Sequence, residues 1–243
     1  MLTLFKKEIR AFLSSLIGYI AICVFLLLVG LFLWILPTDS NILTNGYAGL
    51  DSLFSLTPWV FLFLIPAITM RSFADEKKAG TMEFLLTKPL TDLQIILAKY
   101  FASVTLVLFS LLPTLIYYYT IYKLGNPVGN IDSGGTWGSY IGLFFLASAF
   151  AAIGIFASSL SDNQIVAFIL AVFFCFFFYI GFEYISMLDL FGKVDNLILS
   201  IGINDHYTSM SRGVIDTRDV IYYLSLTGIF ILLTKTILES RKW

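Results

Sequence analysis

Charged residues are scarce in this sequence. They make up only 13% of the 243 residues, whereas a soluble globular domain usually carries about 25%. Hydrophobic residues reach 58%, and the mean hydropathy is +0.89. A soluble fold of this length could not bury so much apolar surface, so the composition excludes a soluble domain and predicts that the chain lies in a lipid bilayer. No basic tract is present, so we expect no nucleic-acid partner.

Several motifs of chemistry are also missing. The sequence has no G-x-x-x-x-G-K-[ST], so it cannot hold nucleotide phosphates in a Walker A loop, and no serine lies in a G-x-S-x-G context. Its one histidine, His206, cannot form a metal site alone, and we expect a plain surface role for it. Cys23 and Cys175 lie in apolar runs and are expected to be free thiols. We therefore predict a chain that is not an enzyme and binds no cofactor.

What the sequence does contain is six runs long enough to cross a bilayer, which needs about 20 apolar residues in a helix. The predicted spans are 16–36, 52–70, 100–122, 138–160, 165–182 and 220–238. The first is longer than a signal-peptide core and is expected to stay uncleaved. The second could begin ahead of Pro58 or at it. The fold class is thus all-α integral membrane, a single domain over 1–243 with both termini on one side.

The positive charges predict the orientation. With both termini cytoplasmic, 11 of the 15 Lys and Arg residues lie inside and four outside. This matches the positive-inside rule, so we expect a multi-pass inner-membrane protein with cytoplasmic N- and C-termini.

Two segments outside the spans are expected to form surface helices. Residues 1–15 predict an amphipathic interfacial helix. Its apolar face is Phe5, Ile9, Phe12, Leu13 and Leu16, opposite Lys6, Lys7 and Arg10. The outer loop 183–219 is apolar enough over 185–203 to form short amphipathic helices at the outer surface.

The cytoplasmic region 71–99 is the most informative stretch. Gly80 is expected to end a charged helix, and Thr81 to cap a new helix with Glu83 in its first turn. Pro89 limits that helix to about two turns. Residues 91–94 predict a capping box that opens the third span. The short helix, residues 81–87, could rest on lipid headgroups or dock a cytoplasmic partner.

The pattern E-x-x-x-G-T-x-E-x-L-L-x-x-P in this region, with Lys99 ten residues past the proline, resembles the coupling-helix region of type-2 ABC exporter permeases. That resemblance extends over nearly the whole chain. It implies an interface with a separate ABC ATPase. Two copies of this ATPase are expected, and they bind the ATP and Mg. The implied interface residues are Glu76, Gly80, Thr81, Glu83, Phe84, Leu85, Leu86 and Pro89, together with Asp162 and Asn163 in the turn 158–164.

The resemblance also implies a second permease, as a homodimer or a related heterodimer partner, and short helices before the sixth span that partly re-enter the membrane. Segments 125–135, 138–143 and 206–216 are similar to gliding-motility-associated permeases of Bacteroidetes. Two other functions stay open. One is a non-transporting anchor that transmits ATPase cycles to a periplasmic auxiliary protein, and the other is a channel or receptor unrelated to ATP. The cargo is not deducible.

Overall fold

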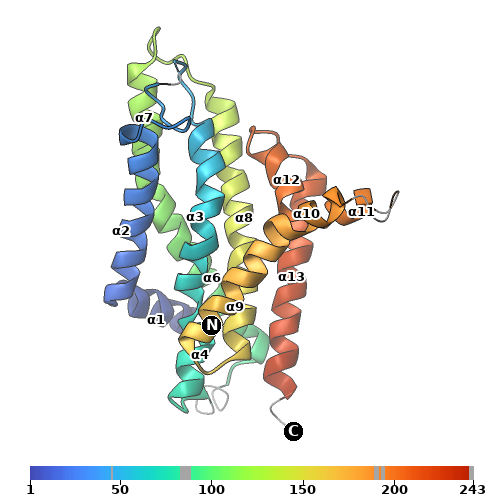
Figure 1. The fold of residues 1–243 in the computed structure, drawn as a ribbon. Helices are drawn as coiled ribbons and strands as arrows, with labels where there is room; N and C mark the ends of the chain where they lie inside the picture. The colour runs from blue at the N-terminus through green and yellow to red at the C-terminus, as the bar shows by residue number, and fades with distance from the viewer. Residues whose placement is uncertain (45, 83–88, 189–191, 193–194, 241–243) are drawn as a thin grey trace.

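The computed structural model of the chain describes residues 1–44, 46–82, 89–188, 192 and 195–240, and within these ranges it contains helices and no strand. Six helical stretches of the described residues are long and apolar enough to cross a membrane (Figure 1). They are Leu16–Ile35 (α2, Leu16–Gly30, and η1, Leu31–Ile35), Asp51–Lys78 (α3, Asp51–Thr69, and α4, Arg71–Lys78), Asp92–Leu124 (α6, Asp92–Leu111; η2, Leu112–Thr114; α7, Leu115–Leu124), Ser133–Leu160 (α8), Gln164–Met187 (α9, Gln164–Phe176; η3, Phe177–Gly181; α10, Phe182–Met187) and Thr217–Glu239 (α13). The all-helical fold and the six apolar helices are thus confirmed.

Five of the six helical stretches run further than the predicted spans, and the first ends one residue earlier, at Ile35. In the cytoplasmic region 71–99, α4 follows α3 directly and ends before Gly80, and α6 begins at Asp92 after the capping box, as the sequence predicted. The predicted capping box at the start of α6 is confirmed. The Gln94 amide donates to Thr91 Oγ1 (3.3 Å), and the Thr91 amide donates to Gln94 Oε1 (3.2 Å).

Pro58 does not begin the second span, since α3 starts at Asp51 and continues through Pro58. A proline inside a helix has no N–H and leaves the carbonyl four residues earlier without its helical partner. Here that carbonyl belongs to Phe54, and the Tyr207 hydroxyl donates to it at 2.6 Å. A side chain from the far end of the sequence therefore compensates for the proline and fixes α3 to α12 (Ile203–Met210).

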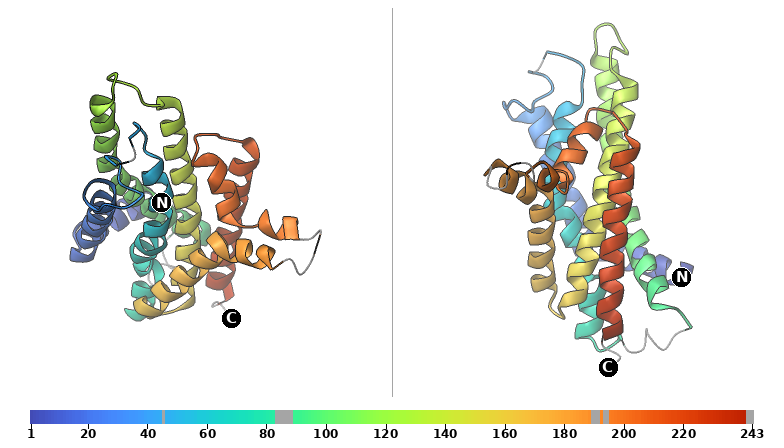
Figure 2. Two further views of the ribbon diagram at one scale, coloured as in Figure 1. Left: turned by 45° about the horizontal axis from the view of Figure 1, so that its top comes forward. Right: turned by 90° about the vertical axis from the view of Figure 1, so that its right-hand side faces the viewer.

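Helix α8 is the centre of the bundle and packs against α3, α6, α9 and α13 (Figure 2). Its apolar window is 78% buried, whereas that of the α2 stretch is 22% buried. Small residues allow this, because close approach of backbones replaces the hydrophobic effect as the packing force in lipid. At Gly154 a Cβ would lie 2.1 Å from Thr69 Oγ1, so α3 and α8 touch where a side chain is missing.

Helix α1 (Leu2–Leu13) lies across the end of the bundle at which α4 and the last turn of α13 also lie, and we call this the α4 end (Figure 1). A helix is present where the sequence predicted one, and its location at the membrane interface stays a prediction. Leu4 is buried, and Phe5, Ile9, Phe12 and Leu13 pack on the core. Leu16 does not join this face. Ser15 caps a new helix by accepting from the Gly18 amide (3.1 Å), and Leu16 becomes the exposed first residue of α2.

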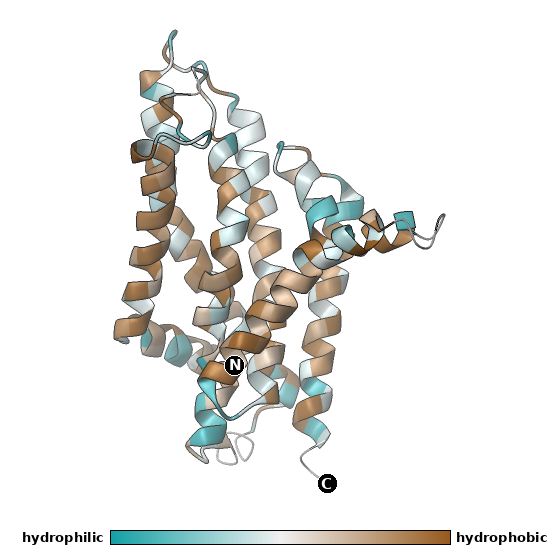
Figure 3. Ribbon diagram, in the orientation of Figure 1, coloured by the Kyte–Doolittle hydropathy of each residue, from teal (hydrophilic) through white to brown (hydrophobic). Residues whose placement is uncertain are grey.

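The opposite end, the α12 end, carries α10, α11 (Asp195–Leu199) and α12. Helices α10 and α11 project sideways from the bundle (Figure 2), and hydrophilic residues gather on α12 (Figure 3). The expectation of short helices between the last two spans is confirmed, whereas their re-entry into the membrane stays a prediction.

His206 at this end is not the plain surface residue that the sequence predicted. Its Nδ1 lies 2.8 Å from Asp219 Oδ1 and its Nε2 lies 2.9 Å from the Ser200 carbonyl oxygen, and its ring stacks on Tyr222 at 3.8 Å. The imidazole is only 16% exposed. It fixes α12 to the first turn of α13.

Candidate functional site

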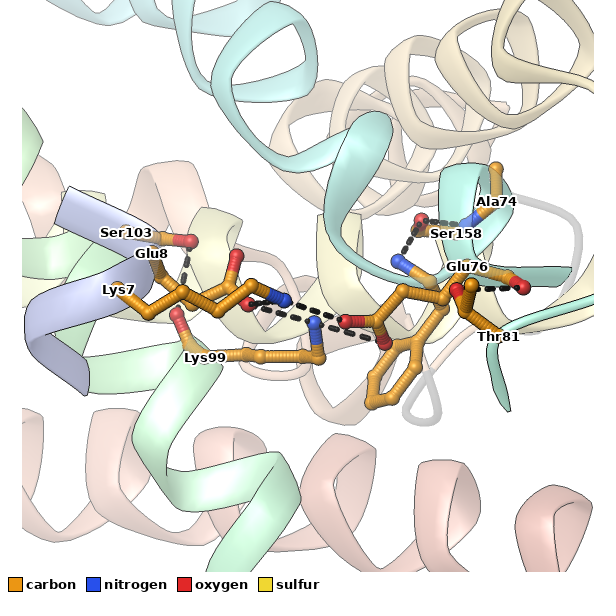
Figure 4. Close-up of polar contacts among 9 residues, drawn as sticks. Lys7, Glu8, Ala74, Glu76, Thr81, Lys99, Ser103 and Ser158 are labelled. Carbon is orange, nitrogen blue, oxygen red and sulfur yellow. Dashed lines mark hydrogen bonds and ion pairs between the residues drawn. The ribbon is translucent and has the colours of Figure 1, made fainter. Parts of the chain in front are cut away.

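The candidate site is the α4 end, and it begins with the junction of α3 and α4. The first amides of a helix have no partner within the helix. In α4 the Phe73 amide (3.0 Å) and the Ala74 amide (3.2 Å) donate to the Ser158 hydroxyl of α8. The same hydroxyl donates to the Met70 carbonyl at 2.9 Å. One serine thus attaches α4 to the central helix (Figure 4).

A cluster of four charges joins α4 to α1 and α6 (Figure 4). Lys99 of α6, whose side chain is 1% exposed, places its ammonium 3.0 Å from Glu8 Oε1 of α1 and 3.0 Å from Glu76 Oε2 of α4. Lys7 completes the cluster, 3.1 Å from Glu76 Oε1 and 3.5 Å from Glu8 Oε1. Two cations therefore face two carboxylates, and the cluster has no net charge.

The buried member of this cluster is the energetically decisive one. Removing water from an ammonium costs several kcal/mol, which only close partners offset, so Lys99 requires both carboxylates. Lys99 and Glu76 form an ion pair without a hydrogen bond of good geometry. Within the described residues, Glu76 Oε2 accepts no well-aligned hydrogen bond, although the Lys99 ammonium is 3.0 Å away. Lys7 lies at the exposed edge of this cluster. Its partial burial lowers its pKa, but the carboxylates of Glu8 and Glu76 have the larger combined effect and raise that pKa above its ordinary value.

The second cytoplasmic segment of the prediction, the turn 158–164, lies directly against α4. The Lys77 ammonium donates to the Ser159 carbonyl, and the Gln164 amide donates to the Asp75 carboxylate. The structure thus brings together the two segments that the sequence singled out separately.

Besides Glu76, the structure describes five residues of the predicted interface. Asp162 is exposed in the turn, and Asn163 caps α9 by accepting from the Ile165 amide at 2.9 Å. Gly80 ends α4 as predicted, with a φ of +65°, and the Thr81 amide and hydroxyl then donate back to the Glu76 carbonyl. Pro89 lies in a bend. The remaining predicted residues, Glu83, Phe84, Leu85 and Leu86, and with them most of the predicted helix 81–87, lie outside the described residues.

A small cavity of about 180 Å³ lies between α1, α4 and α6. It is lined by the charged residues Lys7, Glu8, Arg71, Asp75, Glu76 and Lys99. No cluster of His, Cys, Asp and Glu able to hold a metal occurs in the described part of the chain. The arrangement suits mechanical connection between helices more than chemistry on a bound substrate.

Sequence reasoning missed Glu8 and the role of Lys99. It counted Lys99 among the charges of the cytoplasmic region 71–99, but the structure buries its side chain in α6. The available signal was a lysine within the apolar run Ile95–Leu106 and one acid among the basic residues of the first helix. Pairing the two requires the fold, because 91 residues separate them.

Comparison with known proteins agrees with this architecture. No curated protein sequence matches the chain. The family model described as "ABC-2 family transporter protein" matches residues 35–237, which is most of the chain. Membrane components of this family lie in the lipid bilayer as permease subunits of ABC transporters, and an ABC ATPase is their partner. The chain therefore belongs to the ABC-2 family of transporter proteins and is a multi-pass membrane protein.

Proposed function

We propose that the chain is the permease subunit of a type-2 ABC exporter in the cell inner membrane, with both termini cytoplasmic, and that its α4 end receives the motion of a separate ATPase subunit. The observation that supports this is the way α4 is held. Lys99 and Ser158 connect it to α1, α6 and α8, and Asp75 and Lys77 connect it to the turn 158–164. A displacement of the segment after Gly80 would therefore also move α1, α6, α8 and the turn 158–164.

In this proposal, ATP and Mg are bound by two copies of the ATPase, which dock against residues 81–87 and against Asp162 and Asn163. When the ATPase pair closes, it pushes on the segment after α4. Because α4 continues α3 and lies on α8, the push tilts the core helices, and a pathway opens between this chain and a second permease, either an identical copy or a related partner. The similarity of segments 125–135, 138–143 and 206–216 to gliding-motility permeases makes surface gliding the proposed process.

The test is purification of the native complex under mild conditions. We expect an ABC ATPase to copurify with the chain, and we expect the chain alone to show no ATP hydrolysis above background. A native complex that contains no ATPase would overturn the proposal and favour a channel or receptor. Reconstitution of the complex in proteoliposomes then separates export from anchoring, since an anchor would hydrolyse ATP without moving any cargo.

A further inference from the structure

The α12 end holds a cavity whose walls differ in chemistry from one side to the other. It has a volume of about 430 Å³ and lies between α3, η3, α10 and α12. Its apolar walls are Trp59, Tyr179, Ile180, Tyr184 and Met187, and its polar walls include Glu183, Asn204, Thr208 and Arg212. A neighbouring cavity of about 370 Å³ shares these four polar residues and adds Asp205 and Ser209. The two cavities therefore meet at one polar rim.

That polar rim contains two opposite charges, Glu183 and Arg212, that form no salt bridge with each other. Within the described part of the chain, Glu183 accepts one hydrogen bond, from Asn204 Nδ2 at 2.8 Å. The Arg212 guanidinium has neither a hydrogen bond nor an ion pair to any described residue, so the two charges line one cavity without forming a salt bridge. Two charges held apart in this way offer separate partners to an incoming cation and an incoming anion.

The apolar walls add a second recognition element and a path out of the cavity. Trp59 packs edge-on against Tyr179, with ring centroids 5.9 Å apart, and is itself 47% exposed. Phe63, one helical turn further along α3, is 59% exposed. An apolar surface thus leads from the polar rim along α3 toward the middle of the apolar helices, which is where acyl chains lie.

We propose that this cavity binds a zwitterionic phospholipid of the leaflet on the α12 side. The ammonium of the headgroup pairs with Glu183 beside the aromatic rings, which also favour a cation. The phosphate pairs with Arg212, whose planar guanidinium suits phosphate oxygens. The glycerol and upper acyl chains lie along Trp59 and Phe63. Neither ATP nor the α4 end takes part, so this binding stands independently of the proposed ATPase coupling.

The test uses the purified full-length chain in detergent. Dioctanoyl phosphatidylethanolamine is titrated and bound lipid is counted by native mass spectrometry, with dioctanoyl phosphatidylglycerol and soluble phosphoethanolamine as comparison probes. We expect the zwitterionic lipid to bind most tightly. Glu183→Gln and Arg212→Gln should each weaken its binding about tenfold, and Glu183→Gln should leave the weaker binding of the anionic lipid unchanged.

Arg218→Gln is the matched control, because Arg218 is another exposed arginine of the α12 end and lines neither of these two cavities. It should bind like the unmodified chain. Three results would overturn the proposal. They are equal binding of both lipids, equal binding of phosphoethanolamine and the lipid, and unchanged binding in both Glu183→Gln and Arg212→Gln when the variants elute as folded protein.

Discussion

Lys99 and Glu76 lie 3.0 Å apart although one belongs to α6 and the other to α4, and the lysine is 1% exposed. The contact connects the helix that precedes the predicted docking segment with the helix that follows it. Glu8 adds α1 to the same ammonium at 3.0 Å. The α4 end is therefore one connected unit, and its central link is a buried charge.

The first prediction concerns that charge. Lys99→Met keeps much of the side-chain volume and leaves the carboxylates of Glu8 and Glu76 with Lys7 alone. Removing one member of a buried ion pair costs about 3–5 kcal/mol, and we expect the lower part of this range because Lys7 remains. The measurement is the free energy of unfolding of the purified chain in an SDS titration.

Lys235→Met is the control, since the ion pair that Lys235 forms with Glu239 (3.4 Å) is exposed and worth less than about 0.5 kcal/mol. The double variant Glu76→Gln with Lys99→Met leaves a neutral Lys7–Glu8 pair and should regain part of the loss. If Lys99→Met is no more harmful than Lys235→Met, the cluster does not stabilise the α4 end.

The second prediction concerns Glu83, in the segment predicted to dock the ATPase. If its carboxylate becomes buried against donors of the partner, reversing its charge costs about 3–5 kcal/mol, a factor of at least about a hundred in association. We expect Glu83→Lys to insert normally and to lose the copurifying ATPase or its coupled activity. Asp39→Lys, an exposed residue in the loop after α2, should keep both. Retention of both by Glu83→Lys would favour a segment that rests on lipid headgroups.

The third prediction tests the bond from Tyr207 to the Phe54 carbonyl. Tyr207→Phe leaves this buried carbonyl without the partner that compensates for Pro58. An unsatisfied buried acceptor costs about 1–3 kcal/mol, so the variant should unfold at a correspondingly lower SDS fraction. Tyr19→Phe, an exposed residue of α2, should show no change. Equal stability of the two variants would mean that another group satisfies the carbonyl.

The fourth prediction compares two glycines in helices. Gly154→Ala places a methyl group 2.1 Å from Thr69 Oγ1, so α3 and α8 must separate, and overpacking of this kind costs about 1–3 kcal/mol. At Gly228 in α13 nothing lies within 4 Å of a new Cβ. There the gain in helix propensity should stabilise the chain by up to about 1 kcal/mol. We therefore expect Gly154→Ala to lower the free energy of unfolding and Gly228→Ala to raise it. A stabilising Gly154→Ala would contradict the close packing of α3 and α8.

The fifth prediction concerns orientation. In a Cys23→Ala, Cys175→Ala background, Val128→Cys at the α12 end should react with an impermeant thiol reagent added from the periplasm, and Lys78→Cys at the α4 end should not. The expectation rests on the positive-inside rule, since the predicted topology places 11 of the 15 basic residues in the cytoplasm. Labelling of Lys78→Cys alone would reverse the topology and remove the α4 end from the cytoplasm.

The sequence by itself was sufficient for the fold class, the six apolar helices, the amphipathic α1, the end of α4 at Gly80 and the capping box at Thr91. Each of these depends on local composition or on residues a few positions apart. Long apolar runs must become helices in lipid, because their backbone polar groups find no other partner there. The membrane class therefore follows from composition alone.

Only the tertiary structure decided where α3 begins, where Lys99 lies and what His206 does. Sequence left the start at Pro58 open because a proline favours the first turn of a helix, and only the Tyr207 hydroxyl shows how α3 continues through it. The sequence did not predict that Lys99 is buried, because its partners Glu8 and Glu76 are 91 and 23 positions away. Partners that far apart in the chain meet only when helices pack, and burial then turns ordinary surface charges into a structural link.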